Sequence, residues 1–304
     1  MQLSAIGVAV LLFAGPALAV PDDLDDAFRS LQEAQSKKDA VQVKKLAAQT
    51  CALARKQISA PAPESDDEKE AWTKRVAYAR DIELNTEYAL FATAVQGPPA
   101  TTVELLSALE EQNPKSKYLE EAYPRYFLAL NQTGASAKIP AIAEKAIVQF
   151  PDNEDLLLLL ADTALTRKQS DRALRYATRL IAVTGKHPKP EGISAADWQR
   201  KRNAALGRGY WITGIVQSEQ NKYTAADQAL RAALPLFEGD EGMKGAVLFH
   251  LGMVNYQLGK MTNNRARVLE AAAFSDRSAA LKSPYAQQAW HNGHVMRAEA
   301  LKMP

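Results

Sequence analysis

Runs of residues with high helix propensity, separated by short breaks, dominate this sequence. Ala, Leu, Glu, Lys, Gln and Arg recur within the runs, and the alternating apolar and polar pattern of β-strands is nearly absent. Proline and glycine mark the breaks, as in Gly97-Pro98-Pro99 and Asn113-Pro114. The sequence therefore predicts an all-α fold. We expect helices near residues 22–36, 39–58, 67–94, 101–112, 116–132, 138–149, 153–167, 170–184, 195–220, 223–236, 241–258, 263–281 and 285–301.

The connections between most of these helices are short. Successive helices joined in this way must lie antiparallel to each other, and one helix pair cannot cover its own apolar face. A series of such pairs is therefore expected to stack as an α-solenoid. Pro124 lies inside the helix expected at 116–132, so we expect that helix to kink there or to begin later.

Small residues recur at a spacing that fits helix pairs. One unit has Ala161 in its first helix and Ala173, Ala177 and Leu180 in its second, and another has Gly214, Ala226, Leu230 and Ala233. Small side chains at these points let two helices cross closely. Three further units have the same spacing but not small residues at every position. They are Phe127, Ile139, Ala143, Ala146 and Pro151; Leu90, Thr102, Leu106, Leu109 and Pro114; and Gly252, Asn264, Val268 and Ala271.

This spacing resembles that of tetratricopeptide repeats, whose units of about 34 residues are helix pairs. The resemblance covers about two thirds of the chain and implies a tetratricopeptide-like α-solenoid. On this basis we expect an N-terminal helix pair at 20–65, which would cap the solenoid, and a repeat domain at 66–304 with an insertion near 185–204. A helical repeat or bundle outside this family is the structural alternative.

Residues 1–19 are typical of a secretory signal peptide. They contain no charged side chain, and the apolar run from Ala5 to Ala14 has the length of a signal core and is too short to span a bilayer. Gly15-Pro16 and Ala17-Leu18-Ala19 follow, as before a signal-peptidase cleavage site. We expect a mature chain that starts at Val20 and is exported to a periplasm or secreted. A buried N-terminal helix is the alternative.

Charge and cysteine content exclude several classes of protein. A net charge of +2 gives no electrostatic footprint for nucleic acid, and no segment predicts an integral membrane span. Cys51 is the only cysteine, so the chain can form no intramolecular disulfide, and we expect Cys51 to be a small core residue rather than a reactive thiol.

The motifs of the common enzyme mechanisms are missing from the sequence. The chain has no G-x-S-x-G, H-E-x-x-H, P-loop or dinucleotide-binding motif, so it predicts neither catalysis nor a cofactor. His291 and His294 share one helix face, and zinc would need two more ligands, for which Asp276 and Glu299 are merely available nearby in sequence. A solvated or core-edge histidine pair is the better interpretation, so no metal site is predicted. A hydrolytic enzyme on a helical scaffold remains the least favoured alternative.

The resemblance implies a ligand groove lined by the first helix of each pair. Transferred by spacing, its residues here are Leu158, Asp162, Arg208, Trp211, Ile215, Phe249, Met253 and Tyr256. Such an apolar and aromatic strip would suit an amphipathic helix or an extended apolar peptide. The other interpretation is that these residues are core, covered by tight coiling or by the C-terminal helix with Trp290 and Met296.

The sequence thus predicts an exported scaffold or adaptor that binds a protein or peptide. An accessory glycan-binding module, with Trp211 stacking on sugar, or an envelope-assembly module is the alternative.

Overall fold

The computed structural model describes residues 23–189 and 192–304, and the expected signal peptide and mature start lie outside them. Within the described residues the chain forms thirteen α-helices, two short 3-10 helices and no strand, and successive helices pack in sequence order. The prediction of an all-α, solenoid-like fold is confirmed. In this part of the chain, no helix combines the length and the apolar character needed to cross a membrane.

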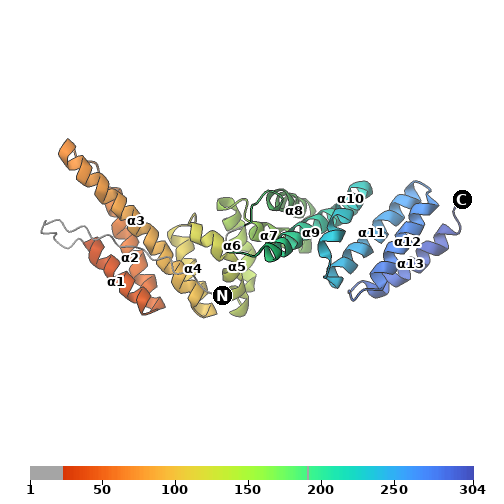
Figure 1. The fold of residues 1–304 in the computed structure, drawn as a ribbon, viewed down its shortest axis with the longest axis horizontal. Coiled ribbons are helices and arrows are strands. Elements are labelled where there is room, and N and C mark those ends of the chain that lie inside the picture. Colours follow the sequence, from red (N-terminus) through yellow and green to blue (C-terminus); the bar gives the residue numbers. More distant parts are fainter. Residues whose placement is uncertain (1–22, 190–191) are drawn as a thin grey trace. The chain divides into compact units, whose positions relative to one another are not determined.

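The chain divides into two compact units between Asn113 and Pro114. The first unit contains α1 (Asp23–Ser36), α2 (Ala40–Ile58), α3 (Asp66–Gln96) and α4 (Pro99–Gln112). Helix α3 packs against both α1 and α2. Figure 1 shows that α3 is the longest of the four and extends beyond the ends of α1 and α2.

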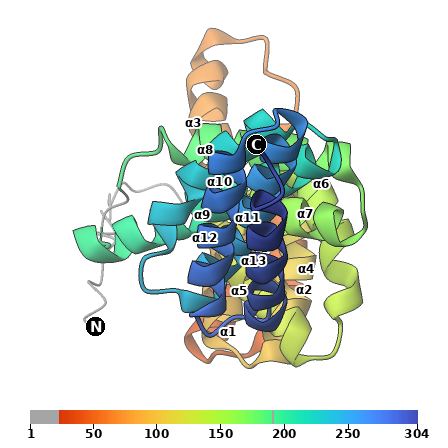
Figure 2. The same ribbon diagram turned by 90° about the vertical axis from the view of Figure 1, so that its right-hand side faces the viewer.

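The second unit alternates helices that we call A and B. The A helices are α5 (Lys117–Gln132), α7 (Glu154–Thr166), α9 (Ala195–Glu219), α11 (Glu241–Met261) and α13 (Ala286–Ala300). The B helices are α6 (Ile139–Gln149), α8 (Ser170–Thr184), α10 (Tyr223–Ala233) and α12 (Arg265–Ala279); η1 (Ser136–Lys138) precedes α6 and η2 (Leu234–Phe237) follows α10. Each B helix except α6 packs between two A helices. Figure 2 shows α11, α12 and α13 side by side.

Five of the turns within helix pairs have the same backbone geometry. Each contains one residue with positive φ, namely Lys38, Gly134, Lys168, Asn221 or Asn263. In each turn the next residue's N–H donates to a carbonyl five residues earlier, for example Gln169 to Ala164 at 2.8 Å. This is the Schellman arrangement that satisfies the last carbonyls of a helix. The five helix pairs, including α1 and α2, therefore share one type of connecting turn.

The small residues of the predicted spacing lie where paired helices approach most closely. Ala161, Ala173 and Ala177 are fully buried between α7 and α8. A Cβ at Gly214 of α9 would lie 2.6 Å from Cγ of Leu230 on α10, so only glycine fits there. The expected packing role of these positions is therefore confirmed.

The last predicted unit needs a correction at Asn264. This residue is exposed and its side chain caps α12 by accepting a hydrogen bond from the N–H of Arg267, so it is not a packing residue. Gly252 does lie against Ala271, as the unit required. Gly245 and Gly259 also approach residues of the α12 region, and these three glycines, seven residues apart, let α11 approach α12 closely.

Helix α5 is continuous through Pro124, where we expected a kink or a later start. Proline has no N–H, so the carbonyl of Glu120 loses its helical donor. The side-chain amide of Asn153 donates to that carbonyl instead, at 3.3 Å. Asn153 also caps α7 by accepting from the N–H of Leu156, so one residue compensates for the proline and starts the next A helix.

Candidate functional site

The predicted groove residues lie along the seams between successive A helices. Between α7 and α9, Arg208 Nε donates to Asp162 Oδ1 at 2.8 Å. The two side chains are 30% and 36% exposed, so the ion pair lies at the surface of this seam. It is a charged, solvent-accessible feature on the A-helix face.

The seam between α9 and α11 is aromatic. The guanidinium of Arg208 lies over the Trp211 ring, 4.3 Å from its centroid, and Arg208 also approaches Met243 Sδ at 3.3 Å. Trp211 meets His250 edge-on at 6.1 Å between ring centroids. Trp211 Nε1 and His250 Nε2 are buried and have no hydrogen-bond partner among the described residues. This seam therefore combines a cation–π contact with two unsatisfied ring nitrogens.

The seam between α11 and α13 is closed by the C-terminal helix region. Phe249 stacks on Tyr285, the N-cap residue of α13, with ring centroids 4.7 Å apart. Met253 accepts a hydrogen bond from Asn292 of α13. Met253 and Tyr256 pack against a cluster from α12 and α13 that includes Met296. The alternative in which the C-terminal helix covers these residues therefore describes this seam.

Burial divides the predicted strip into two parts. Trp211 is 8% exposed and Phe249 is 6% exposed, so neither ring offers a flat surface to a sugar or a peptide. Leu158 and Ile215 are half-buried and pack at the edges of core clusters. The accessible part of the strip is therefore centred on Asp162, Arg208 and Ile215.

Burial also shifts two pKa values along the A-helix face. It raises the pKa of Asp162, and the nearby Arg208 only partly offsets this effect. Burial lowers the pKa of His250 from 6.5 to about 4, so this imidazole is neutral at physiological pH. Asp162 is therefore easier to protonate than an ordinary aspartate.

Three contacts of the seams escaped sequence reasoning. Met243, His250 and Tyr285 surround Arg208, Trp211 and Phe249, but they lie outside the positions transferred by spacing. His250 carried a weak signal, because a histidine beside Phe249 in an apolar helix is expected to be packed. Tyr285 carried no signal in the sequence, because this residue lies in the connection before α13 and helical spacing does not relate it to Phe249.

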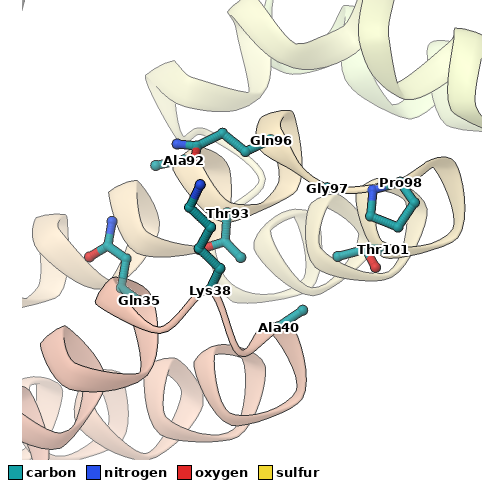
Figure 3. Close-up of a pocket in the computed structure, with 9 residues that line it drawn as sticks. All are labelled: Gln35, Lys38, Ala40, Ala92, Thr93, Gln96, Gly97, Pro98 and Thr101. Atoms are coloured by element: carbon teal, nitrogen blue, oxygen red, sulfur yellow. The ribbon is translucent and has the colours of Figure 1, made fainter.

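The first unit contains a small cavity of about 230 Å³ (Figure 3). Its wall comes from the turn between α1 and α2, the C-terminal end of α3 and the beginning of α4. The lining residues are Gln35, Lys38, Ala40, Ala92, Thr93, Gln96, Gly97, Pro98 and Thr101. Sequence reasoning did not predict this cavity, because its wall joins segments far apart in the chain.

Cys51 is buried in the same unit, and burial raises the pKa of its thiol. Both features fit the expected small core residue. In residues 23–189 and 192–304, no three His, Cys, Asp or Glu side chains gather in a way that could hold a metal ion.

The repeated helix pairs and the ion pair on the A-helix face define a helical-repeat protein with an accessible polar centre in its second unit. The sequence matches no protein-family model, and no curated protein matches it either.

Proposed function

We propose that this protein is an exported adaptor that binds another protein or a peptide on the A-helix face of its second unit. The observation that carries the proposal is the Asp162–Arg208 pair, which joins α7 and α9 at the surface of successive repeats. The partly exposed apolar side chain of Ile215 lies on the same helix as Arg208. Interfaces of this kind combine arginine with apolar contacts, and arginine is enriched among the residues that dominate binding.

The tetratricopeptide-like spacing supports this location for the ligand. Stacked helix pairs present extended surfaces made of equivalent helices, which suit a helix or an extended peptide. The burial of Trp211 and Phe249 moves the proposed contact from the aromatic residues to the ion pair and its apolar neighbours. The partner that best fits is a peptide segment with apolar side chains and at least one polar group for Arg208 or Asp162.

Site-specific photo-crosslinking tests the proposal. A photoreactive residue at Ile215 on A helix α9 is compared with one at Val148 on B helix α6, which is 72% exposed. Both variants are checked for helicity by circular dichroism, and crosslinked species are identified by mass spectrometry from native envelope fractions. We expect a specific protein adduct at Ile215 and none at Val148. The same adducts at both positions, or none at Ile215, would remove the A-helix face as the binding surface.

We also propose that the chain is exported and cleaved after Ala19. The apolar run from Ala5 to Ala14 and the small residues Ala17 and Ala19 support this step. Fractionation and intact-mass measurement of the expressed full-length chain test it. A mature chain that starts at Val20 outside the cytoplasm is expected, and an uncleaved cytoplasmic chain would contradict export.

A further inference from the structure

The small cavity of the first unit has a polar wall with one cation and no carboxylate. Lys38 lies in the turn between α1 and α2, and Figure 3 shows its side chain directed toward α3. Gln35, Thr93, Gln96 and Thr101 supply the other polar side chains. These five side chains converge on one space and make no hydrogen bond or ion pair among the described residues. The adjacent Lys37, by contrast, pairs with Glu33 at 3.7 Å.

Thr93 is the most informative of the five. It is only 8% exposed, yet its hydroxyl has no hydrogen-bond partner in the described part of the chain. Two other buried threonines in this unit do have acceptors: Thr86 donates to the carbonyl of Glu83 at 2.6 Å, and Thr102 donates to that of Ala94 at 2.8 Å. The hydroxyl of Thr50 is fully buried and has no partner among the described residues, but Thr50 does not line the cavity. The Thr93 hydroxyl is not sealed from solvent, so from the cavity wall it can donate to a group that binds there.

The beginning of α4 contributes Thr101 to the same wall, while Ala100 lies outside it. Its N-cap residue is Pro98, which makes no side-chain cap, and Pro99 has no N–H. The first helical hydrogen bond in the structure runs from the N–H of Thr102 to Pro98, so the N–H groups of Ala100 and Thr101 have no intrahelical acceptor. A helix N-terminus of this kind favours negative charge, through both its free N–H groups and its dipole.

The geometry points to a binding site for a small anion, held through a phosphate or carboxylate group. Lys38 supplies the countercharge, and the hydroxyls of Thr93 and Thr101, with the free N–H of Thr101, donate to the anionic oxygens. The volume of about 230 Å³ suits one such group with a short carbon chain rather than a drug-sized ligand. Because this site lies wholly in the first unit, it is independent of the adaptor function proposed for the second.

Titration of the isotope-labelled full chain by NMR tests the site. Inorganic phosphate and acetate are added in separate experiments at constant ionic strength. We expect saturable shifts of the Ala100 and Thr101 amide signals with at least one of the two anions, and the responding anion identifies the preferred group. No saturable shift of these amides with either anion would overturn the proposal.

Two variants and a matched control make the assignment specific. Lys38→Gln is expected to weaken binding about tenfold, as for loss of a hydrogen bond to a charged group. Thr93→Val keeps the shape of the side chain and is also expected to weaken binding. Lys37→Gln removes the same charge one residue away, outside the cavity, and should leave binding unchanged. Equal weakening by Lys37→Gln and Lys38→Gln would overturn the site. Unperturbed amide signals of the first unit away from the cavity report that each variant is folded.

Discussion

The buried imidazole of His250 makes the stability of the second unit sensitive to acid. Its pKa is lowered from 6.5 to about 4, so the native state resists protonation that the unfolded chain accepts. The stabilisation is fully present above pH 6.5 and is lost as the pH falls toward 4, and the difference between the two values corresponds to about 3 kcal/mol. Asp162 acts in the opposite direction, because its raised pKa favours the native state at low pH.

We predict that His250→Phe flattens this acid dependence. Phenylalanine can fill the space between Trp211, Phe249 and Tyr285 without a titrating nitrogen. Urea unfolding at pH 7.5 and at pH 4.5 measures the effect. The wild-type chain should lose more stability than the variant between the two pH values, and equal losses would show that His250 does not titrate in this way.

Gly214 tests the close approach of α9 to α10. A Cβ there would lie 2.6 Å from Leu230 Cγ and 3.3 Å from the carbonyl oxygen of Ala226. Although alanine favours helix formation by about 1 kcal/mol, Gly214→Ala should destabilise the chain by about 1 to 3 kcal/mol, because the two helices must move apart. The matched control is Gly242→Ala in α11, where the nearest atom is 3.4 Å away. Urea unfolding should show a loss of stability only for Gly214→Ala.

At the scale of elements, the repeated turn places ordinary residues in the left-handed region. Lys168, between α7 and α8, has a φ of 56°, a conformation that costs a residue with a Cβ about 1 kcal/mol. Lys168→Gly should therefore stabilise the chain by roughly 0.5 to 1 kcal/mol. Arg167→Gly changes the preceding residue, whose φ is −82°, and should not stabilise. Thermal unfolding of both variants measures these changes in stability. A more stable Arg167→Gly variant or a less stable Lys168→Gly variant would show that Lys168 is not strained.

The elements themselves were predictable because local signals mark their ends. The helix at Ser170–Thr184 begins and ends at the residues expected from the sequence, and the other boundaries differ by at most a few residues. Pro124 does not delay the start of α5, and the carbonyl that it leaves without a helical donor accepts a hydrogen bond from Asn153, the N-cap residue of a later helix. The packing role expected for Asn264 was wrong because an asparagine at this position of the repeat can also cap a helix. The turn at Asn263 places Asn264 at the N-cap of α12.

At the scale of the whole molecule, the sequence predicted the positions of the candidate site better than their exposure. Spacing placed Asp162 and Arg208 on one face of the A helices, and the structure joins them. It could not show that Tyr285 would stack on Phe249, because the path of the chain between α12 and α13 sets that contact. The cavity around Lys38 could not be predicted either, because two segments far apart in the chain, residues 35–40 and 92–101, form it.

The adaptor proposal places the ligand on the A-helix face and not on the B-helix face. Two matched ion pairs, one on each face, allow the two surfaces to be compared. Asp162–Arg208 joins A helices α7 and α9, whereas Glu144–Arg172 joins B helices α6 and α8 at similar exposure. Asp162→Asn with Arg208→Gln, and Glu144→Gln with Arg172→Gln, each remove both charges and leave no lone charge behind. Each double variant is therefore suitable for the same binding assay.

The most direct measurement is the affinity of each double variant for the partner identified by crosslinking at Ile215, determined by calorimetry with purified full-length chains. We predict that the A-helix variant loses about tenfold or more in affinity, as for loss of a charged hot-spot contact, while the B-helix variant binds like wild type. Unchanged binding by the A-helix variant, or an equal loss in both, would contradict a ligand surface on the A helices.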